Sequence, residues 1–262
     1  MDELEEVDRL LIRRIFNAPI SACVESLYLE LGLTPIHIIV KSRRVKYLHY
    51  LLRLKESEML FKVFQAQLKY PVRDDWTITV KQDLEDLRIN LSFEEIKGKS
   101  EWSFKKLVKM KTKEYALDYL LKLKGKHSKM SKLQYSELEI QNYLKNGNIT
   151  VKEAQNLFRY RTRVAKFKEN FKNNYDGIEC PLCSDQPDTQ AHCVQCPIIR
   201  ENIIIKGDYS EIFSDDISKE ISQTLLEITN FREHQLSPAG GPSASDDAAN
   251  GSISNVHLFD LG

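Results

Sequence analysis

The stretch CPLCSDQPDTQAHCVQC, residues 180–196, holds four of the five cysteines of the chain. Cys180 and Cys183 form a Cys-x-x-Cys pair, whose tight turn can aim both sulfurs at one ion. His192 and Cys196 follow at i, i+4 spacing, which places both side chains on one face of a helix. Three thiolates and one imidazole are a donor set that structural zinc prefers. The spacing therefore predicts one Zn²⁺ ion that orders this part of the chain.

The second half of the segment leaves the fourth ligand open. Cys193 and Cys196 are also separated by two residues, so a four-cysteine site with His192 outside it has suitable spacing too. A redox dithiol needs only one such pair and typically lies in a βαβ setting, which the flanking sequence does not show. Four protein ligands leave no position for water, so we expect a structural metal rather than a catalytic one.

Helical patterns extend from the cysteine segment in both directions. Apolar periodicity predicts helices over residues 2–16, 21–31, 34–54, 58–70, 103–124, 150–172 and 217–235. Capping boxes predict three helix starts, at Ser92…Glu95, Ser136…Glu139 and Thr150…Glu153. Gly32 is expected to end the second helix in a left-handed conformation. No set of alternating strands is recognisable, so the chain is predicted to be all-α.

The first predicted helix has apolar residues at helical spacing. They predict a buried stripe formed by Leu4, Val7, Leu11 and Ile15.

The composition of the chain changes from Ser237 onward to SPAGGPSASDDAANGS, whose residues are too small and polar to bury a core. We therefore expect a helical body over residues 1–172, a zinc knuckle with a C-terminal helix over 173–236, and a disordered tail over 237–262.

The charge of the chain is distributed unevenly along the sequence. Residues 41–170 carry 30 Lys and Arg against 16 Asp and Glu, a net +14. Residues 1–40 carry 3 against 7, a net −4, and residues 171–262 carry 5 against 15, a net −10. A basic middle indicates a polyanionic partner such as nucleic acid, although solvated lysine-rich helices give the same pattern.

The best candidates for phosphate contact lie in the helix that precedes the cysteines. Guanidinium groups bind phosphate bidentately, and charge neutralisation dominates affinity for nucleic acid. Pairing of these cations with acidic residues of the same chain is the alternative interpretation. The candidates are Arg159, Arg161, Arg163, Lys166 and Lys168. Secondary candidates are Lys105, Lys106, Lys109, Lys111, Lys113, Lys122, Lys124, Lys126 and Lys129.

The sequence argues against a membrane protein. No apolar run approaches the roughly 20 residues that a membrane-spanning helix needs. The N-terminal sequence MDELEEVDRL is acidic and lacks the basic-then-apolar order of a signal peptide. Clustered cysteines suit a reducing compartment better than a secreted disulfide framework. We therefore expect an intracellular protein, in the nucleus or the cytoplasm.

Four longer segments resemble one known family. They are IFNAPISACVESLYLELGLTPIHIIVKSRRVKYLHYLL (15–52), VKQDLEDLRINLSFEEIK (80–97), NLFRYRTRVAKFKENF (156–171) and CPLCSDQPDTQAHCVQCP (180–197). Over about residues 5–236, the chain resembles the C-terminal part of non-LTR retrotransposon reverse transcriptases, a thumb-like helical region followed by a zinc knuckle. The family's Cys-Cys-His-Cys pattern maps onto Cys180, Cys183, His192 and Cys196. The family's His-to-Cys gap is commonly four residues and here it is three, which leaves Cys193 as a possible substitute.

The resemblance also indicates what this chain lacks. The family's polymerase needs palm carboxylates, typically in an aromatic-x-Asp-Asp motif, to hold two metal ions. The Asp-Asp pairs here, at residues 74–75, 215–216 and 246–247, are not in an apolar, strand-like context. With 262 residues we also expect no endonuclease domain.

The resemblance therefore implies a non-catalytic fragment that binds RNA or DNA. One alternative is a positioning part of a larger RNA-directed DNA polymerase. Another is an adaptor that binds a protein partner through its acidic ends and amphipathic helices. The sequence does not indicate an oligomeric state.

Overall fold

The computed structural model describes residues 2–73, 75–127, 130–145, 147–214 and 217–237, and in these ranges the chain is helical, as predicted. The extended pairings within them are two isolated β-bridges, Leu31 with Ile140 and Glu179 with Pro187. Apart from Ser237, the predicted tail lies outside the described residues. The chain divides into two compact units, Met1–Gln141 and Asn142–Gly262.

This division lies earlier in the chain than the predicted boundary after residue 172. The reason is the packing of α9 (Val151–Arg161), whose most extensive contacts are with α12 (Lys219–Leu236). Its apolar residues Leu157 and Tyr160 belong to the same buried core as the cysteines. The basic residues at positions 159–168 and the cysteines at positions 180–196 therefore belong to one folded unit.

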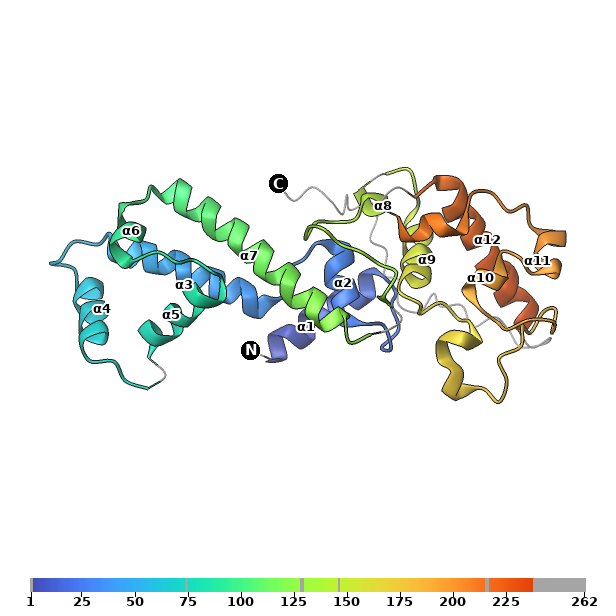
Figure 1. Ribbon diagram of the computed structural model, residues 1–262, viewed down its shortest axis with the longest axis horizontal. Helices are drawn as coiled ribbons and strands as arrows, with labels where there is room; N and C mark the ends of the chain where they lie inside the picture. Colours follow the sequence, from blue (N-terminus) through green and yellow to red (C-terminus); the bar gives the residue numbers. More distant parts are fainter. Residues whose placement is uncertain (1, 74, 128–129, 146, 215–216, 238–262) are drawn as a thin grey trace, which may run out of the picture. The chain divides into compact units, whose positions relative to one another are not determined.

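Two long helices organise the first unit (Figure 1). α3 (Ile36–Leu52) and α7 (Glu101–Lys124) lie side by side. The ring of His49 stacks on Phe104 with centroids 4.8 Å apart, and its Nε2 lies 3.0 Å from the carbonyl oxygen of Lys99. These contacts hold the C-terminal end of α3 beside the N-terminal end of α7. The other helices of the unit are α1 (Asp2–Ile15), α2 (Val24–Leu31), α4 (Met59–Lys69), α5 (Trp76–Asp86) and α6 (Phe93–Gly98).

Gly32 ends α2 as predicted, with φ of 62°. A Cβ at this position would lie 2.3 Å from the backbone of Glu139, so glycine is required for the close approach of that segment. The amide of Gln141 donates to the carbonyl of Glu30 over 3.0 Å. The predicted helix start at Ser136 is wrong, because residues 136–139 form bends and Ile140 then pairs with Leu31 in a β-bridge. The capping boxes at Ser92 and Thr150 are confirmed.

The predicted buried stripe of α1 is also wrong. Exposed fractions range from 43% to 61% for the four residues of the stripe: Leu4, Val7, Leu11 and Ile15. The helix instead turns a partly polar face toward its neighbours. Tyr28 donates a hydrogen bond to Asp8 over 2.6 Å, and the Nδ1 atom of His37 lies 2.5 Å from Glu5. Ile12 is buried on the same side of α1, so the predicted apolar stripe faces outward.

In the second unit, α9 and α12 lie side by side (Figure 1). The buried core between and around them is apolar and contains Leu157, Tyr160, Cys180, Cys193, Cys196, Ile221, Leu225 and Ile228. The shorter elements are α8 (Asn142–Lys145), η2 (Lys168–Asn174), α10 (Gln190–Cys193), α11 (Pro197–Asn202) and η3 (Tyr209–Phe213). Because three cysteines belong to this core, the cysteine segment is part of the packing of the unit.

The predicted continuous helix over residues 150–172 is interrupted. α9 ends at Arg161, and Arg163 adopts a left-handed conformation with φ of 54°. The amides of Val164 and Ala165 both donate to the carbonyl of Arg159, at 2.9 and 3.1 Å. This turn directs Ala165 and Phe167 into the core, whereas a straight helix would carry them along the surface.

Candidate metal centre

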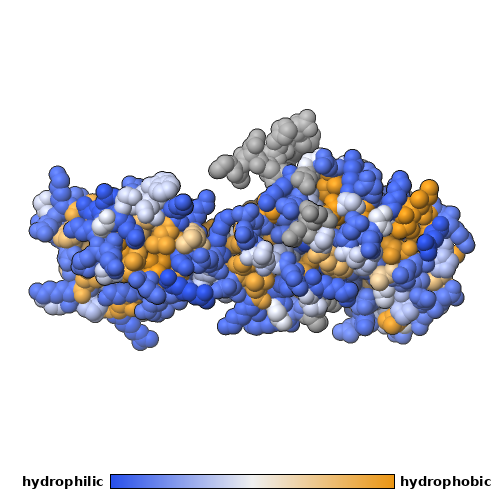
Figure 2. Space-filling model, turned by 45° about the horizontal axis from the view of Figure 1, so that its top comes forward, coloured by the Kyte–Doolittle hydropathy of each residue, from blue (hydrophilic) through white to orange (hydrophobic). Residues whose placement is uncertain are grey.

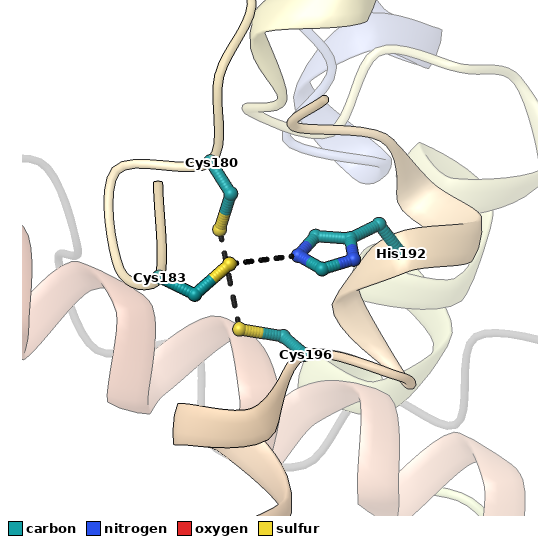
Figure 3. A group of neighbouring side chains, drawn as sticks. All are labelled: Cys180, Cys183, His192 and Cys196. Atoms are coloured by element: carbon teal, nitrogen blue, oxygen red, sulfur yellow. Dashed lines mark hydrogen bonds between the residues drawn. The ribbon is translucent and has the colours of Figure 1, made fainter. Parts of the chain in front are cut away.

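The structure brings together the four side chains that the resemblance selects (Figure 3). They are Cys180, Cys183, His192 and Cys196, here called the Cys₃His cluster. Their ligand atoms all lie within 4.8 Å of one another. The Sγ atoms of Cys180 and Cys196 are 4.0 Å apart, and Sγ of Cys183 lies 3.3 Å from Nε2 of His192. This group could hold one metal ion.

The distances between ligand atoms in the Cys₃His cluster are close to those of a tetrahedral zinc site. Zinc–sulfur and zinc–nitrogen bonds of ordinary length place two sulfurs about 3.8 Å apart and a sulfur and a nitrogen about 3.6 Å apart. The distances of 4.0 and 3.3 Å lie close to these values. The donor set and its spacing therefore fit Zn²⁺ with all four positions taken by protein atoms.

A short loop aims the first two thiols. The amide of Cys180 donates to the carbonyl of Gln186 over 2.7 Å, and the amide of Ser184 donates to the carbonyl of Cys180 over 2.9 Å. Ser184 adopts φ of 59°, which allows the chain to reverse immediately after Cys183. The β-bridge between Glu179 and Pro187 closes the loop.

A capped turn of helix supplies the other two ligands. Thr189 caps α10, its hydroxyl accepting a hydrogen bond of 2.9 Å from the amide of His192. The amide of Cys196 donates to the carbonyl of His192 over 2.7 Å, so the two ligands are joined by one turn. Pro197 then starts α11 at a position where a proline costs no hydrogen bond.

The structure places Cys193 outside the cluster. Its Sγ donates to the carbonyl of Gln190 over 2.9 Å, and its side chain is fully buried in the apolar core. The ligand atoms that lie within 4.8 Å of one another are those of Cys180, Cys183, His192 and Cys196, and Sγ of Cys193 is not among them. Of the two ligand sets that spacing allows, the geometry favours the one with His192.

The thiols of the cluster differ in how readily they ionise. The backbone amide of Asp185 lowers the pKa of Cys183, which favours its thiolate. Burial raises the pKa of Cys196 to about 11. Metal binding must therefore displace a proton from Cys196, and a dication offsets that cost because it inverts the local electrostatics.

A buried ion pair anchors the ligand loop to α12. The Nη2 atom of Arg232 lies 2.9 and 3.0 Å from the two carboxylate oxygens of Asp188, and both side chains are buried. The guanidinium also lies over the ring of Phe167, 4.6 Å from its centroid. Asp188 accepts a further hydrogen bond of 3.0 Å from the amide of Lys168. This pair joins η2, the loop and α12.

We expect Asp188→Asn to destabilise the second unit by about 3 kcal/mol or more, because it leaves the charge of Arg232 buried without its partner. Chemical denaturation followed by circular dichroism measures the change. Asp176→Asn removes an exposed carboxylate of the same unit and is the matched control, expected within about 0.5 kcal/mol of the unchanged protein. Equal stabilities for the two variants would contradict this role of the pair.

The basic residues before the cysteines do not form one exposed face. Arg161 is buried, and its Nη1 donates to the carbonyls of Ile212 and Ser214 while its guanidinium lies over the ring of Tyr143. The prediction that Arg161 contacts phosphate is therefore wrong. Its guanidinium is buried and binds two carbonyls at the end of η3, which holds η3 against α9. Its burial follows from the packing of α9 against η3, which the sequence pattern did not indicate.

The other four selected cations are at least partly exposed. Lys166 lies 3.1 Å from Glu233, and Arg163 lies 4.0 Å from Glu169. Lys168 lies over the ring of Tyr175, 5.8 Å from its centroid. Arg159 is half-buried. Lys166 and Arg163 thus follow the alternative interpretation, in which the cations pair with acidic residues of the same chain.

We expect Arg161→Ala to destabilise the second unit by about 3 kcal/mol, because two carbonyls lose charged donors and a buried aromatic contact is removed. Thermal unfolding measures the loss. Lys166→Ala removes an exposed cation nearby and should change stability by less than about 0.5 kcal/mol. A larger effect on nucleic-acid affinity than on stability would contradict the structural role of Arg161.

A different group of cations gathers between α3 and α7. We call Arg43, Lys46, Lys105 and Lys109 the α3–α7 basic cluster. Burial lowers the pKa of Lys46, and the positive charges of its three neighbours in the cluster lower it further. In the described part of the chain, only Lys105 of these four has a carboxylate partner, Glu101 at 2.5 Å. The lysines of α7 are only secondary candidates in the sequence, and their proximity to Arg43 and Lys46 is not visible there because α3 and α7 are far apart along the chain.

No family model matches the chain, and no curated protein or solved structure is significantly similar to it. None of the helices in the described ranges combines the length and the hydrophobicity that crossing a bilayer requires.

Proposed function

We propose that this chain is a non-catalytic nucleic-acid-binding part of a non-LTR retrotransposon reverse transcriptase. One structural Zn²⁺ ion in the Cys₃His cluster would stabilise its second unit. The observation that carries the binding proposal is the α3–α7 basic cluster. The family assignment depends on the sequence segments that resemble reverse transcriptases.

The α3–α7 basic cluster suits a phosphate backbone. Arg43 and Lys46 are three residues apart on α3, and Lys105 and Lys109 are four residues apart on α7, so each pair lies along one helix face. The two helices lie side by side, which joins both pairs into one positive surface. The positive charges of Arg43, Lys105 and Lys109 act unfavourably on that of Lys46. A bound polyanion offsets this repulsion and releases its own counterions.

Aromatic side chains extend the same surface. Tyr50 is 50% exposed and lies one turn beyond Lys46 on α3, and Trp102 is 73% exposed and lies one turn before Lys105 on α7. Bases of a single strand stack on exposed aromatic rings, each worth about 1–3 kcal/mol. These rings favour a single-stranded ligand, RNA or DNA, over a duplex.

The Cys₃His cluster supports an architectural role for zinc. All four coordination positions are provided by protein atoms, which leaves none for a substrate or an attacking water. Three thiolates also suit a reducing intracellular compartment, either nucleus or cytoplasm. In this proposal the metal maintains the second unit, and the first unit supplies the main phosphate contacts.

The proposal is tested by fluorescence anisotropy with labelled single-stranded and double-stranded oligonucleotides, titrated at several salt concentrations. We expect binding that weakens steeply as salt rises, with a log–log slope of about −3, because four cations contact the backbone and single strands release about 0.7 counterions per contact. Absence of binding to RNA and DNA at low salt would rule out the proposal. Primer extension with added Mg²⁺ tests the non-catalytic assignment, and any activity would contradict it.

A protein-interaction adaptor is the second candidate. Figure 2 shows hydrophobic patches that interrupt a mainly hydrophilic surface, and the outward stripe of α1 consists of exposed apolar side chains. Such patches are typical of surfaces that contact another protein. Self-association or binding of a protein partner without any salt-dependent nucleic-acid binding would favour this candidate.

A further inference from the structure

A second group of potential metal ligands lies in the first unit. The ligand atoms of Cys23, Glu25 and His127 all lie within 4.8 Å of one another. The Sγ atom of Cys23 donates to Oε2 of Glu25 over 2.9 Å, and the same oxygen lies 3.7 Å from Nε2 of His127. His127 is about 100 positions from Cys23 and Glu25 in the sequence, so spacing could not indicate this group.

Hydrogen bonds position the backbone that carries these residues. Cys23 occupies the N-cap position of α2, yet its thiol makes no capping hydrogen bond and turns to the carboxylate of Glu25 instead. The hydroxyl of Ser26 donates to the carbonyl of Cys23 over 2.6 Å. His127 follows α7, where its amide donates to the carbonyl of Lys124 over 2.8 Å. Contacts between α2 and α7 keep the two segments together.

We propose that Cys23, Glu25 and His127 form a second site for a divalent cation of the Zn²⁺ class. One thiolate, one imidazole and one carboxylate are all donors that zinc accepts, and three protein ligands leave one coordination position open. On binding, the proton that Cys23 donates to Glu25 is released to solvent, and the thiolate and carboxylate both bind the metal. The two negative ligands then balance the charge of the dication.

Two neighbouring cations make this site weaker than the Cys₃His cluster. Arg13 and Lys124 both interact electrostatically with Cys23. Their donors are used by backbone carbonyls: Arg13 donates to Pro19 and Ala22, and Lys124 donates to Leu133. They therefore do not occupy the site, but their charge opposes a dication. His127 is exposed, so the metal binds at the surface with its open position toward solvent.

The test is a titration of the full chain, isolated with its tightly bound metal, with Co²⁺. We expect one additional equivalent of Co²⁺, with visible absorption of a tetrahedral ion and a charge-transfer band from one thiolate. Cys23→Ser, Glu25→Gln and His127→Ala should each remove this equivalent. His127→Ala changes an exposed side chain, and circular dichroism before titration checks that each variant is folded.

Matched controls separate this site from other binding. His234→Ala and Glu56→Gln remove an exposed imidazole and an exposed carboxylate elsewhere and should leave the additional equivalent unchanged. Cys196→Ser should also leave it unchanged, since the Cys₃His cluster belongs to the other unit. Failure of wild type to take up the additional Co²⁺, or retention of it by Cys23→Ser, would overturn the proposal.

Discussion

Cys196→Ser is expected to abolish tight metal binding and to lower the stability of the second unit by at least about 3 kcal/mol. Zinc sites of this kind supply on the order of 10 kcal/mol of apparent binding free energy, most of which is folding free energy. The loss should be large here because Cys180 and Cys196 belong to the buried core. Without the ion, their thiols remain in that core as unpaired polar groups.

Hydrogen exchange locates this effect within the molecule. We expect faster exchange in residues 178–200 and along α12 of the variant, whereas α3 and α7 should keep their protection. Removal of metal from the wild type by a chelator should reproduce the same pattern. A global loss of protection in both units would contradict the assignment of the metal to the second unit alone.

Cys193→Ser is the matched control for this experiment. It changes the same atom in the same core, and a serine hydroxyl can still donate to the carbonyl of Gln190. We expect full metal binding and a modest loss of stability, about 1 kcal/mol, from reduced packing. If Cys193→Ser lost the metal and His192→Ala retained it, the ligand set would be the four-cysteine alternative.

The second large effect is expected from replacing the α3–α7 basic cluster with alanine. The variant Arg43→Ala, Lys46→Ala, Lys105→Ala and Lys109→Ala removes four adjacent positive charges. Affinity for a single-stranded oligonucleotide should fall about 100-fold at moderate salt, and the salt slope should fall by about 3. Stability should not fall, because removing repulsion between like charges offsets the lost packing of the side-chain stems.

The control for this variant keeps the change in net charge and moves it elsewhere in the same unit. The control variant replaces four other exposed lysines of the first unit: Lys62→Ala, Lys69→Ala, Lys81→Ala and Lys97→Ala. We expect a small loss of affinity, less than about fivefold, from long-range attraction alone. Equal losses in the two variants would show that binding depends on total charge and not on this surface.

The spacing of the cysteines predicts most of the Cys₃His cluster, but it does not distinguish His192 from Cys193 as the fourth ligand. Cys180 and Cys183 are held by one loop, and His192 and Cys196 by one helical turn, so short-range geometry places each pair. The choice between His192 and Cys193 depended on the core around them. Cys193 lies in the buried core of the second unit, where its thiol donates to the carbonyl of Gln190. Spacing contains no information about that orientation.

The sequence alone determined the all-α class, the helix caps at Gly32, Ser92 and Thr150, and a ligand group centred on Cys180–Cys196. These features depend on interactions between residues close in the chain, which composition and spacing express directly. Tertiary structure alone decided that Arg161 is buried, that α1 turns its apolar stripe outward, and that Cys23 meets His127. Each of these outcomes depends on which helix faces are packed together, and the free energy of that packing is shared among residues far apart in the sequence. Even the Cys₃His cluster, predicted from its spacing, owes the orientation of its fourth ligand to the core of α9 and α12.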